Sequence, residues 1–174
     1  MIRGTALTAQ GQAQEGLILI RDGIDAIRST GTNIARSRDL GMLAEAQHAL
    51  GQIEDGLATV AEALAFVEQT NEHYIEADLY RLQGELTLDS DAASQACNVE
   101  LNAENCFQRA IKIAKRQQAK SIELRASTSL ARLWQQQNKG QEALRLLSEV
   151  YNWFSEGFDT KDLQEARALL DELG

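Results

Sequence analysis

The stretch GQIEDGLATVAEAL (residues 51–64) repeats the pattern of GQAQEGLILIRDGI (residues 11–24) forty positions later in the chain. Both stretches begin with glycine, and in both the sixth and seventh residues are glycine and leucine. Two later stretches, AENCFQRAI (residues 103–111) and EALRLLSEVY (residues 142–151), follow a similar order of small and large side chains. Self-similarity of this kind is the signature of a repeat protein. The sequence therefore predicts an array of structural repeats.

The repeated positions predict an α-helix in each stretch, which we call helix B. A small residue is followed by a large apolar residue four positions later, and by further packing residues seven and eight positions later. These offsets fall on one face of an α-helix. In chain order the four sets are Gly16, Ile20, Gly23 and Ile24; Gly56, Val60, Ala63 and Leu64; Ala103, Phe107, Ala110 and Ile111; and Ala143, Leu147, Val150 and Tyr151.

A second helix, helix A, precedes helix B in each repeat. It carries a small residue, which permits close helix approach, and three positions later a residue that lies beside that contact. The pairs are Gly4 and Leu7, Ala44 and Gln47, Gly84 and Thr87, and Ala131 and Trp134. The chain also lacks proline and is rich in strong helix formers. We therefore expect one all-α domain, residues 1–174, built as an α-α superhelix of helical hairpins at about 1–30, 34–70, 72–117 and 120–155.

This alternation resembles the tetratricopeptide repeat (TPR), in which helix B carries alanine, a large apolar residue and alanine again. The closest copy of that motif contains Ala103, Phe107 and Ala110. The chain departs from the family in its forty-residue period, against about 34, and in lacking the proline that closes helix B. The resemblance implies a right-handed stack of TPR-like hairpins with a concave groove. The expected helices are 1–9, 12–29, 34–49, 52–69, 72–88, 102–117, 120–138, 140–155 and 160–173.

The last expected helix, residues 160–173, is predicted to cap the array. It places a row of apolar residues on one face, and its charged residues fall largely outside that face. Asp159 or Thr160 can cap its start, and Asp162 in its first turn suits the helix dipole. The apolar row contains Leu163, Ala166, Leu169, Leu170 and Leu173.

Four of the nine aromatic residues lie just before this helix: Tyr151, Trp153, Phe154 and Phe158. We expect them to form a plug beneath the cap, because each buried aromatic side chain covers a large apolar area. Replacing Trp153 or Phe158 by alanine would then loosen the last repeat first. The alternative is an exposed aromatic patch that binds a partner.

Three local signals in the sequence help to place the loops between the expected helices. Asn71 is a plausible N-cap for the helix that follows it, and Gly31 is a plausible helix stop. The third repeat carries seven extra residues in DSDAASQACNVELN (residues 89–102), an acidic segment without helical periodicity. We expect a solvated loop there, and a contact loop for a partner is the alternative.

The start of the chain falls inside the first helix A of the pattern, so the array is expected to begin without a cap. Repeat arrays need their terminal faces covered. The chain is therefore interpreted as a fragment of a longer protein. The alternative is a homo-oligomer in which the open end is buried against another copy.

Composition and charge narrow the classes of partner. The net charge is −9 and the pI about 4.7, and the basic residues are scattered, which disfavours binding to nucleic acid or to an anionic membrane. No apolar run approaches the ~20 residues that span a bilayer, and the start lacks an apolar signal segment. We expect a cytoplasmic chain in which Cys97 and Cys106 are reduced thiols.

Catalytic and cofactor motifs are absent from the sequence. There is no phosphate-binding loop, no dinucleotide fingerprint and no zinc protease motif. Glu45 and His48 have the spacing found in di-iron bundles, but those sites need a second such pair and two more glutamates. We therefore expect no enzyme, no cofactor and no metal site, and an α-helical hydrolase has little support.

The concave groove of a TPR-like stack is lined by the polar residues of helix A that flank its packing positions. We expect the groove to bind a protein or peptide of mixed charge, with arginines available to hold a carboxylate. A small-ligand-sensing module is the alternative. Arg81 and Arg132 are expected to be exposed and to add almost nothing to the melting temperature. The candidate residues are Thr5, Thr8, Arg38, Glu45, His48, Asp78, Arg81, Glu85, Arg125, Arg132 and Gln135.

The C-terminal half has a more specific resemblance. RAIKIAKRQQAKSIELRASTSLARLW (residues 109–134) and EVYNWFSEGFDTKDLQEARALLDEL (residues 149–173) are similar to the C-terminal region of large bacterial signalling proteins. Those proteins join a class III nucleotide cyclase (adenylate cyclase-like) or another signalling domain to a predicted signal-transduction ATPase and TPR-like repeats. The resemblance implies a scaffold that binds partners or neighbouring domains and takes part in signal transduction.

Overall fold

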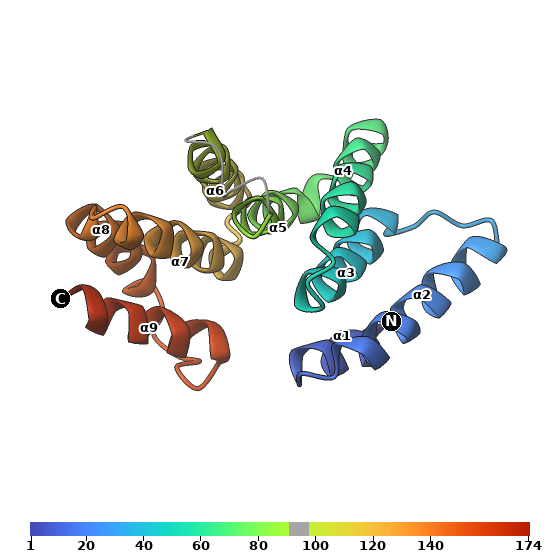
Figure 1. The fold of residues 1–174 in the computed structure, drawn as a ribbon, viewed down its shortest axis with the longest axis horizontal. Coiled ribbons are helices and arrows are strands. Elements are labelled where there is room, and N and C mark those ends of the chain that lie inside the picture. Colours follow the sequence, from blue (N-terminus) through green and yellow to red (C-terminus); the bar gives the residue numbers. More distant parts are fainter. Residues whose placement is uncertain (91–97) are drawn as a thin grey trace.

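The computed structural model describes residues 1–90 and 98–174 of the chain. These residues form nine α-helices and one short 3-10 helix, without any strand (Figure 1). The prediction of an all-α helical-repeat superhelix is confirmed. In chain order the elements are α1 (Ile2–Ala9), α2 (Ala13–Ser29), α3 (Arg36–Ala49), α4 (Ile53–Thr70), η1 (His73–Ile75), α5 (Glu76–Leu88), α6 (Asn98–Gln117), α7 (Lys120–Gln136), α8 (Gly140–Tyr151) and α9 (Lys161–Leu173).

The helices pair as α1–α2, α3–α4, α5–α6 and α7–α8, and each hairpin packs on the next. Figure 1 shows these hairpins arranged in an arc, with α1, α3, α5, α7 and α9 along its inner side and the other helices outside. Helix α9 packs on α7 and α8 and follows α7 on the inner side. It therefore stands where the helix A of a further repeat would stand.

The small residues of the repeat lie where two helices touch. An ideal Cβ atom on Gly4 would be 2.7 Å from the carbonyl oxygen of Gly16, so α1 and α2 meet backbone to backbone. A Cβ on Gly84 would be 2.5 Å from the ring of Phe107, which is completely buried between α5 and α6. The large residues of the other helices B, Ile20, Val60 and Leu147, are also fully buried. The helix-face pattern thus marks the core of every hairpin.

Helix ends differ from expectation at several places. Helix α5 begins at Glu76, after η1, and not at residue 72. Asn71 has left-handed backbone angles (φ 58°) and ends α4, so it is a C-cap and the predicted N-cap is wrong. Helix α8 ends at Tyr151 and not at residue 155, and α6 begins at Asn98 and not at residue 102. Part of the expected loop 89–102 is therefore helical, and its residues 91–97, with Cys97, lie outside the described residues. Gly31 adopts φ +74° after the end of α2, as predicted.

The aromatic plug is only partly correct. Tyr151 and Phe154 are partly buried against the core formed by α7, α8 and α9. Trp153 and Phe158 are 60% and 47% exposed, so they do not seal the last repeat. The Trp153 ring meets Phe154 edge-on at 5.1 Å, and Phe158 lies 5.9 Å from the ring of Tyr151. The early end of α8 explains the error, because residues 152–160 leave the helical face that the pattern assumed.

Among the residues that the structure describes, no helix is both long enough and apolar enough to cross a bilayer.

We predict that Gly84→Ala destabilises the protein although alanine is the better helix former. The added methyl group would push into the Phe107 ring, and overpacking of this kind costs roughly 1–3 kcal/mol. That cost outweighs the propensity gain of about 1 kcal/mol. Urea or thermal unfolding measures the change.

The matched control is Gly140→Ala, where the nearest atom to the new methyl group is Leu173 Cδ2 at 3.9 Å. This variant should be as stable as the parent or slightly more stable. A second variant, Gly84→Ala with Phe107→Leu, should recover part of the loss. Equal stability of the Gly84 and Gly140 variants would contradict the close-packing explanation.

Candidate functional site

A groove of about 700 Å³ lies on the inner side of the arc. All five inner helices contribute to it, so it passes through every repeat of the array. Its lining residues are Thr5, Thr8 and Ala9 of α1; Glu45, His48 and Ala49 of α3; Arg81 and Glu85 of α5; Arg125, Thr128, Ser129 and Arg132 of α7; and Lys161, Asp162 and Glu165 of α9.

Eight of the eleven candidate residues line this groove: Thr5, Thr8, Glu45, His48, Arg81, Glu85, Arg125 and Arg132. Asp78 lies just beside it, in contact with Arg81 and Arg125. Arg38 instead pairs with Asp39 on its own helix, and Gln135 bonds to Glu172 of α9. The repeat pattern therefore brings most of the candidates to one surface.

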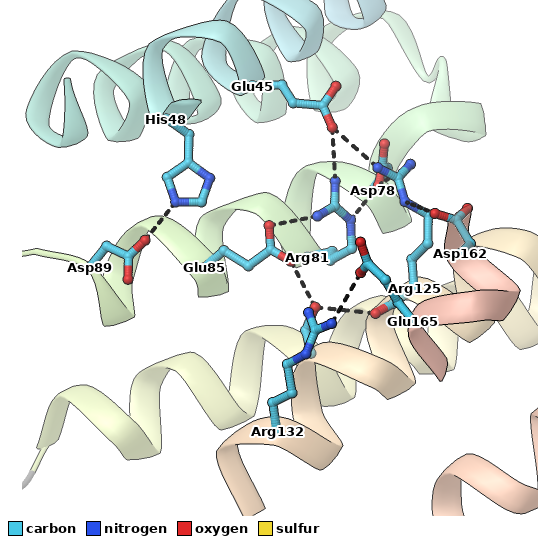
Figure 2. Close-up of polar contacts among 11 residues, drawn as sticks. Glu45, His48, Asp78, Arg81, Glu85, Asp89, Arg125, Arg132, Asp162 and Glu165 are labelled. Atoms are coloured by element: carbon cyan, nitrogen blue, oxygen red, sulfur yellow. Dashed lines mark hydrogen bonds and ion pairs between the residues drawn. The ribbon is translucent and has the colours of Figure 1, made fainter. Parts of the chain in front are cut away.

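Arg81 is at the centre of the site (Figure 2). Its Nε donates to Asp78 Oδ1 at 2.6 Å and its Nη1 to Glu85 Oε2 at 2.6 Å, while Nη2 lies 3.6 Å from Glu45 Oε1. The side chain is only 6% exposed. Burial alone would lower the pKa of the guanidinium, but the carboxylates, Asp78 first, raise its pKa above the ordinary value. Arg81 is therefore a permanently charged, buried anchor, and the expectation that it is exposed is wrong.

Arg125 links three helices. Its Nη2 lies 3.2 Å from Glu45 Oε1 on α3, its Nη1 3.6 Å from Asp78 Oδ1 on α5, and its Nε 3.8 Å from Asp162 Oδ1 on α9. Figure 2 shows Arg125 and Arg81 approaching Glu45 from below, so the two guanidinium groups share one carboxylate. The network thus joins the second, third and fourth hairpins and the last helix.

Asp78 lies between the two arginines. Burial would raise the pKa of its carboxyl group, but the positive charges of Arg81 and Arg125, with the hydrogen bond from Arg81, outweigh burial and hold the pKa below the ordinary value. Asp78 therefore stays ionised and couples α5 to α7.

Helix α9 contributes three lining residues that the sequence analysis did not select: Lys161, Asp162 and Glu165. Arg132 Nη2 lies 3.1 Å from Glu165 Oε2, so α9 closes one end of the groove by an ion pair. The signal was present, since these charged residues fall outside the apolar row of the last helix. They were missed because that helix was interpreted as a solvated cap and not as an inner helix.

Two further groups complete the polar surface. His48 Nε2 lies 2.7 Å from Asp89 Oδ2 at the end of α5, away from Glu45, so Glu45 and His48 do not share a partner (Figure 2). Ser129 Oγ donates to Glu85 Oε1 at 2.7 Å. In the described part of the chain, no group of three acidic, histidine or cysteine residues is arranged to hold a metal ion. The site is an assembly of ion pairs suited to recognising charges.

We predict that Arg81→Ala lowers the free energy of unfolding by about 2–3 kcal/mol. Removing one partner of a buried pair leaves the remaining charges uncompensated, and the partly exposed carboxylates limit the loss. For a chain of this size, that loss corresponds to a fall in Tm of roughly 4–12 °C.

The control is Arg132→Ala, because Arg132 is half exposed and has one ion-pair partner. Its loss should stay within about 1 kcal/mol. If both variants have the same melting temperature as the parent protein, Arg81 is not the structural anchor described above.

We also predict an acid-dependent contribution from Asp78. Its folded pKa is depressed, so its contribution is fully present above the unfolded value of about 3.9 and is lost as the pH falls through the folded pKa. Asp78→Asn should be less stable than the parent at neutral pH, and the difference should shrink as the pH falls below about 4. Urea unfolding at a series of pH values measures it.

The corresponding control is Asp171→Asn, which removes an exposed pair with Arg167 within α9. The free energy of unfolding of this variant should differ little from that of the parent at every pH. If the stability difference between Asp78→Asn and the parent did not change with pH, the link between the ionisation of Asp78 and stability would be ruled out.

Two of the solved structures that are similar to this chain contain TPR-like repeats. One shows the nearly identical TPR-like repeats of a kinesin light chain-like protein of Podosopora anserina. It is 20% identical to this chain, has a TM-score of 0.64, and the match covers 98% of this chain and 81% of that chain. A single-residue variant of it gives a TM-score of 0.67 at 18% identity and the same coverage. No family model and no curated protein matches the sequence. The chain therefore has the fold of TPR-like helical repeats.

Proposed function

We propose that this chain is a non-catalytic interaction module whose inner groove holds an extended polar segment of another protein or of a neighbouring domain. The observation that carries the proposal is the groove itself, which presents charged or hydroxyl side chains from five consecutive inner helices. Solenoid repeats use such concave surfaces for binding, because stacking fixes the spacing of the side chains.

The chemistry of the lining favours a partner that carries both signs of charge. Its four acidic and four basic residues balance each other: Glu45, Glu85, Asp162 and Glu165 against Arg81, Arg125, Arg132 and Lys161. Nucleic acid is a poor partner because the whole chain carries a net charge of −9.

The lining does not favour a small apolar ligand. Sites for such ligands are lined mostly by apolar and aromatic side chains, and the apolar residues of this lining are Ala9 and Ala49. The small-ligand-sensing alternative therefore ranks below a peptide. The paired charges of the groove residues also support a scaffold role.

The cellular context is part of the proposal. The resemblance of the C-terminal half to repeat regions of bacterial signalling proteins supports a role next to a cyclase or ATPase of that kind. On this proposal residues 1–174 form one cytoplasmic domain of a longer chain, and the groove or the first repeat contacts neighbouring domains or a second copy.

We predict that peptides selected from a random phage-displayed library on the intact chain bind in the groove. Nuclear magnetic resonance spectra of the labelled protein, recorded with and without a selected peptide, provide the measurement. Amide shifts should concentrate on α3, α5, α7 and α9, whose side chains line the groove. Residues on the outer faces of α2, α4, α6 and α8 serve as the internal control.

Two results would reject the proposal. One is failure to select any peptide that binds the folded chain. The other is a set of peptides whose shifts map to the outer helices.

A further inference from the structure

The bridge between Glu45 and Arg125 joins helices that are not neighbours in the stack. Glu45 belongs to α3 in the second hairpin and Arg125 to α7 in the fourth, with α5 between them. The two residues are 80 positions apart in sequence, and Arg125 Nη2 lies 3.2 Å from Glu45 Oε1. The pair therefore ties together two arms of the arc across the groove.

The two members of this bridge are accessible, unlike the anchor below them. Glu45 is 38% exposed and Arg125 is 33% exposed, whereas Arg81 is almost fully buried. Arg81 also has two short contacts, to Asp78 and Glu85, within its own helix. Because partly exposed ion pairs contribute little stability, a ligand that reaches the groove can replace the Glu45–Arg125 bridge while the Arg81 anchor stays intact.

The charge balance around the bridge decides which ligand can replace it. Two guanidinium groups, Arg81 and Arg125, face four carboxylates: Glu45, Asp78, Glu85 and Asp162. A carboxylate brought to Arg125 would be the fifth and would meet repulsion. A cation brought to Glu45 leaves Arg125 with Asp78 and Asp162, which already lie 3.6 and 3.8 Å from it. Every charged group then keeps a partner.

The part of the groove that α1 and α3 line also favours a cationic ligand. Among the described residues that line it, α1 and α3 supply hydroxyls, a histidine, alanines and Glu45, but no lysine or arginine. The net charge of −9 attracts cations to the whole molecule.

We propose that Glu45 receives a lysine or arginine side chain of the partner segment, and that this exchange releases the Glu45–Arg125 latch between α3 and α7. The proposal rests on the groove being the binding site and specifies the chemistry that it recognises. Binding then opens the arc, because the contact that draws α3 towards α7 is replaced by one to the ligand.

The affinities of groove-binding peptides test whether Glu45 receives a lysine or arginine side chain. Each lysine or arginine of a selected peptide is replaced in turn by norleucine, and Kd is measured with the parent protein, with Glu45→Ala and with Glu62→Ala. One replacement should weaken binding to the parent by at least about tenfold, as for a charged hydrogen bond, but should have little effect with Glu45→Ala. Glu62 is the matched control, because it pairs with Arg36 outside the groove at 2.6 Å.

A second variant separates recognition from general damage to the groove. Arg125→Ala removes the competitor of the ligand and leaves Glu45 in place, so it should bind the same peptides more tightly, by several-fold. A merely structural role of Arg125 would weaken binding instead. Thermal unfolding shows whether this variant is folded, and the Glu45→Ala comparison stands if it is not.

The latch itself is tested by a distance between spin labels at Ala6 of α1 and Gln164 of α9, both exposed, with Cys97 and Cys106 replaced by serine. Glu45→Ala and peptide binding should each lengthen this distance, and Glu62→Ala should not. If neither Glu45→Ala nor peptide binding changes the distance, the latch is wrong. If groove-binding peptides keep their affinity when each lysine or arginine is replaced, the recognition of a cation by Glu45 is wrong. If no peptide binds the groove, the proposed function fails as well.

Discussion

Close helix approach at small residues is the constraint on which the rest of the structure depends. Gly4 lies against Gly16 and Gly84 against Phe107 so tightly that a Cβ atom at either glycine would force its neighbour to shift. This approach brings each helix A next to its helix B and turns the opposite face of helix A towards the inside of the arc. The polar groove is therefore a consequence of how the hairpins pack.

The same geometry explains why a charged residue can be buried at the centre of the groove. Arg81 lies three positions before Gly84, and the matching positions of the neighbouring inner helices hold Gly41 and Thr128. Thr128 lines the same groove as Arg81 with a short side chain, whereas the side chain nearest to Gly41 is that of Leu79. Carboxylates on the helix of Arg81 and on the adjacent helix compensate its charge, which offsets the cost of desolvation.

Much of the fold was predictable from the sequence, because the packing positions recur with the period of a helix. The groove surface followed from the same register, since residues such as Glu45 and Arg132 each follow the small residue of their helix A. The burial of Arg81 was not predictable, because its charge is compensated by carboxylates that two helices, α3 and α5, bring together. The exposure of Trp153 and Phe158 depends on where α8 ends, and no residue of the repeat pattern marks that end. The place of α9 in the groove was missed because its polar face matches that of a solvated helix equally well.

The lengths of the ionic contacts divide the site into a firm part and an adjustable part. The two contacts at 2.6 Å, from Arg81 to Asp78 and to Glu85, lie within α5. Most contacts that cross between helices are longer, from 3.1 Å for Arg132–Glu165 to 3.8 Å for Arg125–Asp162. Because Coulomb attraction weakens with distance and with solvent exposure, motion of one hairpin against the next disturbs the weaker set first. The helix at the centre of the stack thus keeps its charges compensated while the groove on either side of it can change width.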